Sequence, residues 1–571
     1  MGGLFAALGI GISGMQAHQI AMRITGQNIS NVNTEGYSRQ RADLVGRDPV
    51  DLGYVGAIGR GVDVGDIIQV RDEFLDVLYR TENSNLWQSK TERDYLARVE
   101  DAFLEPSEVG LSTLLDGFFT SLQDFATNPE SQPIRAAVVA SARTLVDSFR
   151  GVTDRLDDLR TDANNAIKDQ VGQINNLSEQ IADLNRRIVD FEAGTAKAND
   201  LRDRRAYLLD QLSRITSIKV TEDKAGAVTV ETGGVDIVRG VFFDEIEAVV
   251  DPSLDPIRND FVKIVHSRSG NDMTITSGEL YGLLNARDNT LPTIETDLND
   301  LAEALIAEFN KIHSQGNGLN GFTSLTSDNF VLAGTEGNDL DDPATGLAFT
   351  PVDGSFEINV IDATGAVSTT TITVDLDGAG ADDSLNDLAA NLNAVGDISA
   401  SVSNGRLVMT ADPTYSFTFS NDSSNVLQVL GLNTFFSGSN AANIDINSVV
   451  ENDLTLIAAS LSIDPLDTGN NENALNLAGL QQGLVMEGGS ASLGDSLNAT
   501  VSNIGNVANR LELEAQTQDL FVREMDARRQ QVSGVDLNEE AANLIRFQRG
   551  FEAAARLITV TDAMLEAVIR M

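Results

Sequence analysis

The sequence predicts a mainly α-helical protein with β insertions, elongated and built from domains nested inside one another. Apolar residues recur every seven positions at both ends of the 571-residue chain and again in its first half, which is typical of long packed helices. In two other stretches apolar and polar residues alternate, which indicates strands. A chain of this length can form several domains, each with its own core.

A long helix is predicted at the C-terminus, over residues 537–569. The face opposite its apolar residues is charged, and we expect its members, including Glu539, Glu540, Arg546 and Glu552, to be exposed. A narrow apolar seam at the end of a chain needs a partner helix. The seam consists of two sets spaced by seven, Leu537, Leu544, Phe551, Ile558 and Leu565 with Phe547, Ala554, Thr561 and Val568.

Residues 1–30 are predicted to form the partner helix. Its own repeat is Leu8, Met15, Met22 and Ile29, and many small residues flank it, among them Gly11 and Gly14. We expect the two terminal helices to pair and the pair to pack against copies of itself; periodicity alone leaves open a plain pair within one chain that closes a globular domain. The predicted assembly interface is therefore Leu8, Met15, Met22, Ile29, Leu544, Phe547, Phe551, Ile558, Leu565 and Val568.

The middle of the chain alternates between helix and strand signals. Helices are predicted over 83–103, 111–127, 201–215, 280–312 and 497–525. A coiled-coil repeat of Ile167, Ile174, Ile181 and Ile188, with Leu177, Leu184 and Phe191 three residues later, fits an intermolecular dimer or an antiparallel hairpin with 201–215. We prefer the hairpin because the turn that follows is short. Residues 217–276 and 315–452 alternate and predict a small β subdomain and a β-rich or α+β insertion.

Composition limits the possible functions. The formal net charge is −45, which argues against a nucleic-acid partner, and the absence of cysteine excludes disulfides and thiolate metal sites. No apolar run is long enough to span a bilayer, so no membrane insertion is predicted. The first basic residue is Arg23, so we expect no cleavable signal peptide.

Chemistry-bearing motifs are few, and we predict no enzyme activity, catalytic residue, metal or cofactor. Asp375–Asp383 shares features with a calcium-binding loop but has Asn386 where the final carboxylate belongs, so a solvated acidic turn is expected. His18 is expected to be a packing residue. Carboxylate pairs leave a secreted hydrolase as a formal alternative, although one tryptophan in 571 residues makes a sugar-binding cleft a poor expectation.

A polar segment follows the first helix and carries a family signature. Asn28, Asn31, Asn33 and Gly36 are turn formers, and Tyr37 can act as an anchor. The segment Asn28–Gln40, which ends in Tyr37, Ser38, Arg39 and Gln40, resembles the N-terminal signature of bacterial flagellar rod, hook and hook-associated proteins, and its ending is most similar to the hook-associated members. Glu35 stands where the family usually has proline. Residues 537–549 likewise resemble the closing helix of that family.

The resemblance implies a structural subunit of the extracellular flagellum, at the junction between hook and filament. It further implies export through the flagellar type III apparatus, a helical domain with a small β-flap, and self-association in a ring or helical array. The implied partners are the hook protein, hook-associated protein 3 and a cytosolic export chaperone that holds the C-terminal helix. Another flagellar axial subunit (hook or distal rod) and a surface adhesin on the same skeleton remain alternatives.

Three domains are expected. Residues 1–60 and 533–571 form a terminal coiled-coil polymerisation domain, and residues 61–314 and 453–532 form the helical domain with its β subdomain at 217–276. Residues 315–452 form an outward-facing β-rich insertion. We expect the termini to be mobile in the monomer and to order on docking, since their seams lack partners.

Overall fold

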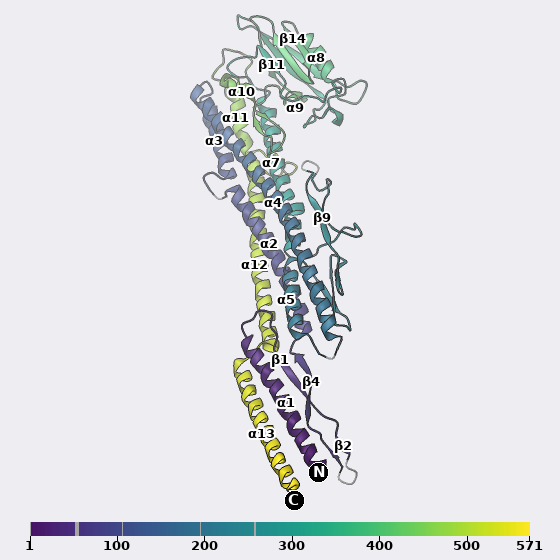
Figure 1. The fold of residues 1–571 in the computed structure, drawn as a ribbon. Helices are drawn as coiled ribbons and strands as arrows, with labels where there is room; N and C mark the ends of the chain where they lie inside the picture. Colours follow the sequence, from purple (N-terminus) through teal and green to yellow (C-terminus); the bar gives the residue numbers. More distant parts are fainter. Residues whose placement is uncertain (1, 52–55, 106, 195, 256–258, 571) are drawn as a thin grey trace. The chain divides into compact units, whose positions relative to one another are not determined.

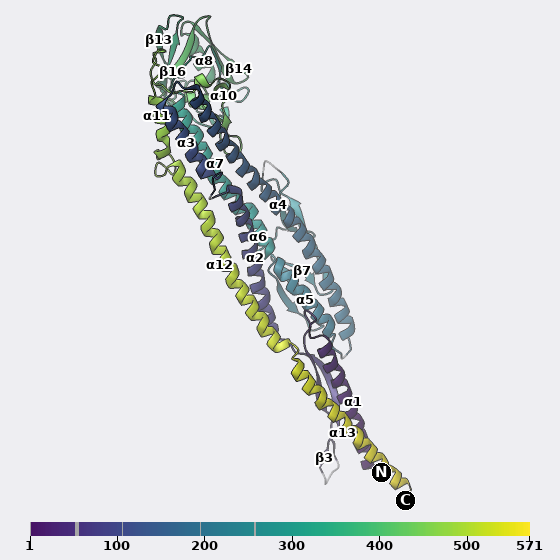
Figure 2. The same cartoon turned by 90° about the vertical axis from the view of Figure 1, so that its left-hand side faces the viewer.

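A computed structural model describes residues 2–51, 56–105, 107–194, 196–255 and 259–570 (Figures 1 and 2). The chain forms two compact units, one of Met1–Tyr95, Thr161–Asp288 and Asn509–Met571 and the other of Leu96–Arg160 and Asn289–Ala508. Helices α2 (Glu73–Phe103), α4 (Gln132–Glu192) and α12 (Leu493–Ser533) contribute residues to both. Long helices with short antiparallel sheets inserted between them confirm the predicted fold class.

The terminal helices belong to the first unit and pair with each other. Helix α1 (Gly2–Ser30) and helix α13 (Leu537–Ile569) run antiparallel, side by side in both views, with N and C at the same end of the pair. The Asp536 side chain caps α13 by accepting hydrogen bonds from the backbone N–H groups of Asn538 and Glu539. A ribbon of β1 (Gln40–Gly46) and β4 (Val62–Gln69) covers another side of α1, and β2 (Val50–Asp51) pairs with β3 (Ala57–Ile58) beyond it.

The predicted helical hairpin of the first unit consists of the second part of α4 and of α5 (Asn199–Ile215). Its isoleucine repeat is fully buried, as predicted: Ile167, Ile174, Ile181 and Ile188 are each 0% exposed. Phe191 was wrongly placed in this seam, because it is 56% exposed. In the last turn of α4 the neighbouring Glu192 faces α5 instead, where Arg202 binds it.

The β subdomain lies along α4 and contains more strands than the sequence predicts. Strands β5 (Lys219–Glu222), β6 (Val228–Thr232), β7 (Val235–Arg239) and β8 (Phe242–Phe243) form one antiparallel sheet in chain order, and β9 (Ile246–Val250) pairs with β10 (Val262–His266). Alternation in residues 218–221, 227–231, 235–238 and 260–265 predicts β5, β6, β7 and β10 but not β8 or β9. After them come α6 (Glu279–Asn285) and a π-helical turn (Ala286–Thr290), which places the buried Arg287 beside Asn164.

Three asparagines of α4 bind this subdomain through its backbone, with the donor and acceptor pattern that a neighbouring strand would offer. Each side-chain amide donates to a backbone carbonyl of the subdomain and accepts from a backbone N–H, so that buried backbone groups are satisfied. Spacings of 11 and 10 residues keep the three on one helix face. The pairs are Asn164 with Asp260 O (3.2 Å) and Val262 N (3.0 Å), Asn175 with Ile246 O (2.9 Å) and N (3.0 Å), and Asn185 with Val228 O (2.8 Å) and N (3.1 Å).

The second unit packs helices around a cluster of phenylalanines. Its helices are the remaining parts of α2, α4 and α12 with α3 (Leu111–Thr127), α7 (Leu291–His313) and α11 (Glu472–Gly479). Phe118, Phe309, Phe435 and Phe436 lie with ring centroids 4.9–6.1 Å apart, a spacing at which aromatic rings attract. The predicted helix 111–127 coincides with α3, whereas the predicted helix 280–312 is divided into α6 and α7 by the π-helical turn.

The inserted β-rich segment belongs to the second unit and has two three-stranded sheets. Strand β12 (Gly354–Ile361) lies between β13 (Val367–Val374) and β16 (Ser416–Ser420), and β15 (Arg406–Ala411) lies between β11 (Ser324–Thr326) and β14 (Ile398–Ser403). The sequence predicts two short helices here, 385–392 and 426–430, and they are α8 (Leu385–Asn393) and α9 (Val426–Leu430). Strands β17 (Phe436–Ser437) and β18 (Asp445–Ile446) and helix α10 (Ser448–Asn452) follow. Among the described helices, none combines the length and apolarity that crossing a membrane requires.

Candidate assembly interface

Helices α1 and α13 approach closely because small residues line their contact. A Cβ at Gly11 would lie 2.8 Å from Ile558 Cγ1, and one at Gly550 would lie 2.6 Å from His18 Nε2, so neither position accepts a larger residue without movement. The ring centroids of His18 and Phe547 are 6.2 Å apart. The two terminal helices thus pair within a single chain, and the expected packing of this pair against copies of itself stays a prediction.

The residues predicted as an assembly interface lie along this pair but are only partly covered by it. Eight are half-buried: Leu8, Met15, Met22, Ile29, Phe547, Phe551, Ile558 and Leu565. The other two, Leu544 and Val568, are 36% and 44% exposed. A single chain therefore leaves much of the predicted seam in contact with solvent.

A further apolar stripe on the outer face of α13 escaped the sequence prediction. Leu557, Val560 and Met564 are 39%, 51% and 52% exposed, and with Val568 they follow at steps of three and four residues along one face. Phe5 of α1 is 59% exposed. The three- and four-residue spacing of these side chains is visible in the sequence. The seven-residue repeat, however, picks out only the neighbouring seam, so this second stripe was not predicted.

The signature segment closes a polar junction around Asn28. This side chain is 1% exposed and makes four hydrogen bonds. Its Nδ2 donates to Gln40 O (2.8 Å) and Glu540 Oε2 (3.1 Å), and its Oδ1 accepts from Tyr37 Oη (2.9 Å) and Gln40 N (3.0 Å). One buried amide therefore fixes α1, the signature segment and α13 to one another.

Glu540 was predicted to lie on the exposed face of α13, and this is wrong: it is 2% exposed. The carboxylate turns toward Asn28 and forms an ion pair with Arg39, whose Nε lies 2.8 Å from Oε1. Arg39 also contacts Glu539 at 2.6 Å, and its backbone N–H donates to Ser533 O at the end of α12. Burying this charge is tolerated because a guanidinium and an amide bind it directly.

The same segment is fastened to α5 by two aspartates. Asp203 accepts a hydrogen bond from the backbone N–H of Ser38 (3.1 Å), and Asp200 accepts one from Gln40 Nε2 (2.8 Å). Burial raises the pKa of Asp203 to about 6, against the pull of its hydrogen bonds and of Arg71. Burial, together with Asp200, Asp203 and Glu540, also raises the pKa of Tyr37.

The remaining signature residues shape the turn itself. Asn31 Nδ2 donates to Gln27 O (2.9 Å), Gly36 has a φ of 77° and lies against Tyr207, and Asn33 is exposed. The structure therefore brings Asn28, Tyr37, Ser38, Arg39 and Gln40 together in the junction, while Asn33 lies outside it.

Helix α12 is anchored next to this junction by Arg529. Its guanidinium lies 2.9 Å from Asp76 Oδ1 and 2.8 Å from Asp210 Oδ2, and its Cζ lies 4.3 Å from the centre of the Tyr79 ring. Asp210 is also paired with Arg80 at 2.7 Å. The planar, always charged guanidinium can join two carboxylates and a ring at once, which lysine cannot.

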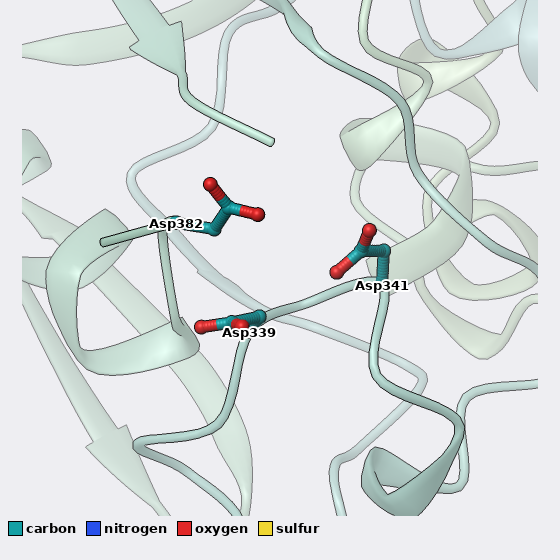
Figure 3. A group of neighbouring side chains, drawn as sticks. All are labelled: Asp339, Asp341 and Asp382. Atoms are coloured by element: carbon teal, nitrogen blue, oxygen red, sulfur yellow. The ribbon is translucent and has the colours of Figure 1, made fainter. Parts of the chain in front are cut away.

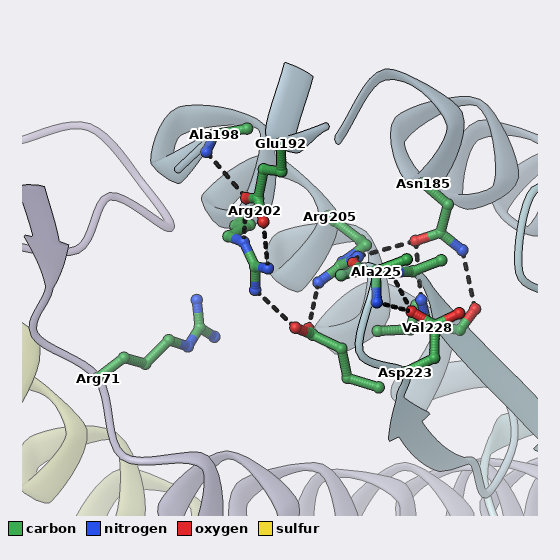
Figure 4. A network of polar contacts seen from close by, with 12 residues as sticks. Arg71, Asn185, Glu192, Ala198, Arg202, Arg205, Asp223, Ala225 and Val228 are labelled. Atoms are coloured by element: carbon green, nitrogen blue, oxygen red, sulfur yellow. Dashed lines mark hydrogen bonds and ion pairs between the residues drawn. The ribbon is translucent and has the colours of Figure 1, made fainter. Parts of the chain in front are cut away.

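A second ionic network stabilises the tip of the α4–α5 hairpin (Figure 4). Arg202 lies 2.7 Å from Glu192 and 2.8 Å from Glu222, and Arg205 lies 2.7 Å from Glu222 and 2.8 Å from the Asn185 amide oxygen. Burial alone would raise the pKa of Glu192, but Arg202 and the Ala198 N–H hold it at about 2. The network therefore fixes the hairpin tip to the β subdomain.

An acidic cluster lies on the β-rich segment, away from both networks in sequence. Asp339, Asp341 and Asp382 each offer a carboxylate oxygen within 4.8 Å of the others (Figure 3), and Asp375 and Asp377 form a similar group with Asp382. Both groups are partly exposed to solvent. The sequence drew attention to Asp375–Asp383 alone, because the loop holding Asp339 and Asp341 is distant in the chain.

Comparisons with known proteins place this geometry in a family. Residues 96–330 match the family described as "Flagellar hook-associated protein FlgK helical domain". Residues 8–37 match "Flagella basal body rod protein", and residues 529–571 match "Flagellar basal body rod FlgEFG protein C-terminal". Flagellar hook-associated protein 1 of Salmonella typhimurium is 30% identical, with 98% of each chain covered. The chain belongs to the flagellar hook-associated protein 1 family.

Other relatives agree with this assignment. Flagellar hook-associated protein 1 of Escherichia coli K12 is 29% identical over 98% of each chain, and that of Bacillus subtilis is 25% identical over 97% of this chain. The solved flagellar hook junction protein FlgK of Burkholderia pseudomallei has the same fold, with a TM-score of 0.50, 17% identity, and 81% of this chain covered. The predicted family is confirmed, and it is a family of structural proteins of the bacterial flagellum.

Proposed function

We propose that this protein is a structural subunit at the junction between flagellar hook and filament and that it assembles through its two terminal helices. The observation that carries the proposal is the α1–α13 pair, which is closely packed on one side and leaves large apolar side chains in solvent on the other. Exposed apolar stripes of this kind mark protein–protein contacts. Membership of the hook-associated protein 1 family supports the place of assembly.

Assembly would cover the side chains that a single chain leaves exposed. Complete burial of a Leu, Ile, Val or Met side chain stabilises a complex by about 1.5–3 kcal/mol, so covering the exposed half of each contributes about 1 kcal/mol. Leu544, Leu557, Val560, Met564 and Val568 together supply about 5 kcal/mol per subunit on this basis. The predicted interface residues and this outer stripe would thus form one surface that neighbouring subunits cover.

The polar junction would transmit this contact to the helical domain. Asn28, Arg39 and Glu540 tie the terminal helices together. The Ser38 N–H bonded to Asp203 ties them to α5, and the Arg39 N–H bonded to Ser533 O ties them to α12. This supports a boundary near the start of α13, with residues 1–60 and 533–571 as the polymerisation domain and 61–314 with 453–532 as the helical domain. Residues 315–452 would face outward.

The partners proposed for the chain follow from its family. They are further copies of itself, the hook protein, hook-associated protein 3 and a cytosolic export chaperone that binds α13 before secretion. Export would use the flagellar type III apparatus. The terminal helices would gain their final order on docking, when their outer faces are covered.

Immunogold labelling of intact flagella with an antibody against residues 315–452 tests this function. A single narrow band between hook and filament is expected. Label along the whole hook would make the protein a hook subunit, and label on the rod would make it a distal-rod subunit. Label on the cell surface with none on flagella would make it an adhesin.

A further inference from the structure

Arg135 in the first turn of α4 is a fully buried cation without a carboxylate partner among the described residues. It is 0% exposed. Its Nε donates to Pro129 O (2.7 Å), and its Nη1 donates to Leu454 O (3.0 Å) and Ile457 O (2.8 Å). Burial lowers its pKa to about 10. Its Nη2 has no hydrogen-bond partner within the described part of the chain, and a buried donor left in this state is costly.

A small cavity lies beside this side chain. Its volume is about 30 Å³, and its lining includes Arg135, Asn317 and Thr418. Asn317 Oδ1 and Thr418 Oγ1 are also buried without a partner in the described residues, and the two side chains are 7% and 6% exposed. Three polar atoms from α4, from the start of the inserted segment and from β16 thus lack partners around one cavity.

The chemistry of these three atoms selects the ligand. Arg135 Nη2 can only donate, Asn317 Oδ1 can only accept, and the Thr418 hydroxyl can do either. The Asn317 amide cannot be turned over without loss, because its Nδ2 already donates to Ser462 O (3.0 Å). A halide would be bound by Arg135 and Thr418 but repelled by the Asn317 oxygen, whereas water accepts one hydrogen bond and donates two. The cavity is large enough to admit a water.

We propose that one water molecule binds in this cavity and joins Arg135 to Asn317 and Thr418. The site lies where the inserted segment leaves and re-enters the helical part of the second unit. Here Asn317 N donates to Ser460 O (2.7 Å), Ala459 N donates to Asn317 O (3.1 Å), and Arg135 holds the carbonyls of residues 454 and 457. The bound water completes this joint and ties the β-rich insertion to the start of α4.

Crystals of the full chain, measured natively and after a bromide soak at the bromine absorption edge, test the ligand. We expect one density peak about 2.7–3.2 Å from Arg135 Nη2, Asn317 Oδ1 and Thr418 Oγ1, without an anomalous signal. An anomalous bromine peak would overturn the proposal in favour of an anion site. A cavity without density in a well-ordered map would overturn it altogether.

The variant Thr418→Val tests the energetic role, because it removes the hydroxyl and keeps the shape. If water is bound, the backbone amide of Asn317 should exchange with solvent about tenfold faster in hydrogen-exchange mass spectrometry, since a net hydrogen bond is lost. If none is bound, the change removes an unsatisfied buried hydroxyl, and exchange should be unchanged or slower. Thr373→Val, an exposed threonine on β13, is the matched control and should leave exchange at Asn317 unchanged.

Discussion

Replacing Asn28 by Asp is the sharpest test of the polar junction, because it changes one NH₂ group to an oxygen without changing the shape. The new oxygen would face Gln40 O and Glu540 Oε2, at the positions where Nδ2 now donates over 2.8 and 3.1 Å. Two donated hydrogen bonds are lost, and a buried carboxylate lies against another. The loss of stability cannot exceed the cost of protonating the new carboxylate, because the protonated side chain can again donate a hydrogen bond. At pH 7 this cost is about 4 kcal/mol for a group whose ordinary pKa is about 3.9.

Competition for incorporation measures this cost in the assembled state. Wild-type and Asn28→Asp chains are expressed together, and their ratio in purified hook–filament complexes is compared with the ratio in the secreted pool. A penalty of 3–4 kcal/mol predicts at least a hundredfold depletion of the variant, at about 1.4 kcal/mol per factor of ten. Asn33→Asp, the same change at an exposed position of the same turn, should show no depletion. Equal incorporation of the Asn28 variant would refute the role assigned to the junction.

Three further predictions concern other parts of the chain. Phe551→Asp should block incorporation while leaving the melting temperature of the helical domain nearly unchanged, since it places a charge in the terminal seam. Normal assembly of this variant would show that the seam is not part of the contact between subunits. Asn185→Ala removes three hydrogen bonds and should lower the free energy of opening of the β subdomain by about 3 kcal/mol, measured as faster hydrogen exchange in residues 226–243. Asn176→Ala, an exposed position on the same helix, should leave this exchange unchanged. Equal exchange in the two variants would contradict the asparagine pairing. His313 is fully buried, and burial lowers its pKa to about 4, so its contribution to stability is complete above its unfolded pKa of about 6.5 and is lost as pH falls through 4. Relative to His313→Gln, the wild type should lose about 3 kcal/mol of unfolding free energy between pH 7 and pH 4, and a pH-independent difference would show that the imidazole is not held neutral.

The helices could be predicted from the sequence because burial of one helix face requires apolar residues at a regular spacing. Ile167, Ile174, Ile181 and Ile188 are each fully buried, and the turn after them led correctly to an antiparallel hairpin. Such patterns report which face of an element is covered, which is a local property of the sequence.

The polar contacts could not be found in that way. Glu540 looks exposed in any helical pattern, and its partner Asn28 lies 512 residues away in the chain. The asparagines of α4 likewise look like solvent-facing residues until the β subdomain provides backbone groups for them. Burial of a polar side chain depends on a partner from another element, so its own sequence neighbourhood carries no signal.

Cysteine cross-linking at Met564 tests the central claim, that the outer face of α13 is a contact between subunits, most directly. The chain has no cysteine, so Met564→Cys introduces the only reactive thiol. With a short bifunctional maleimide, purified hook–filament complexes should give a band at twice the chain mass, the largest product that one thiol per chain allows, and secreted monomers should not. Thr373→Cys on the insertion serves as an exposed control. If intact complexes carrying the α13 thiol give only the single-chain band, the terminal helices do not form the contact proposed here.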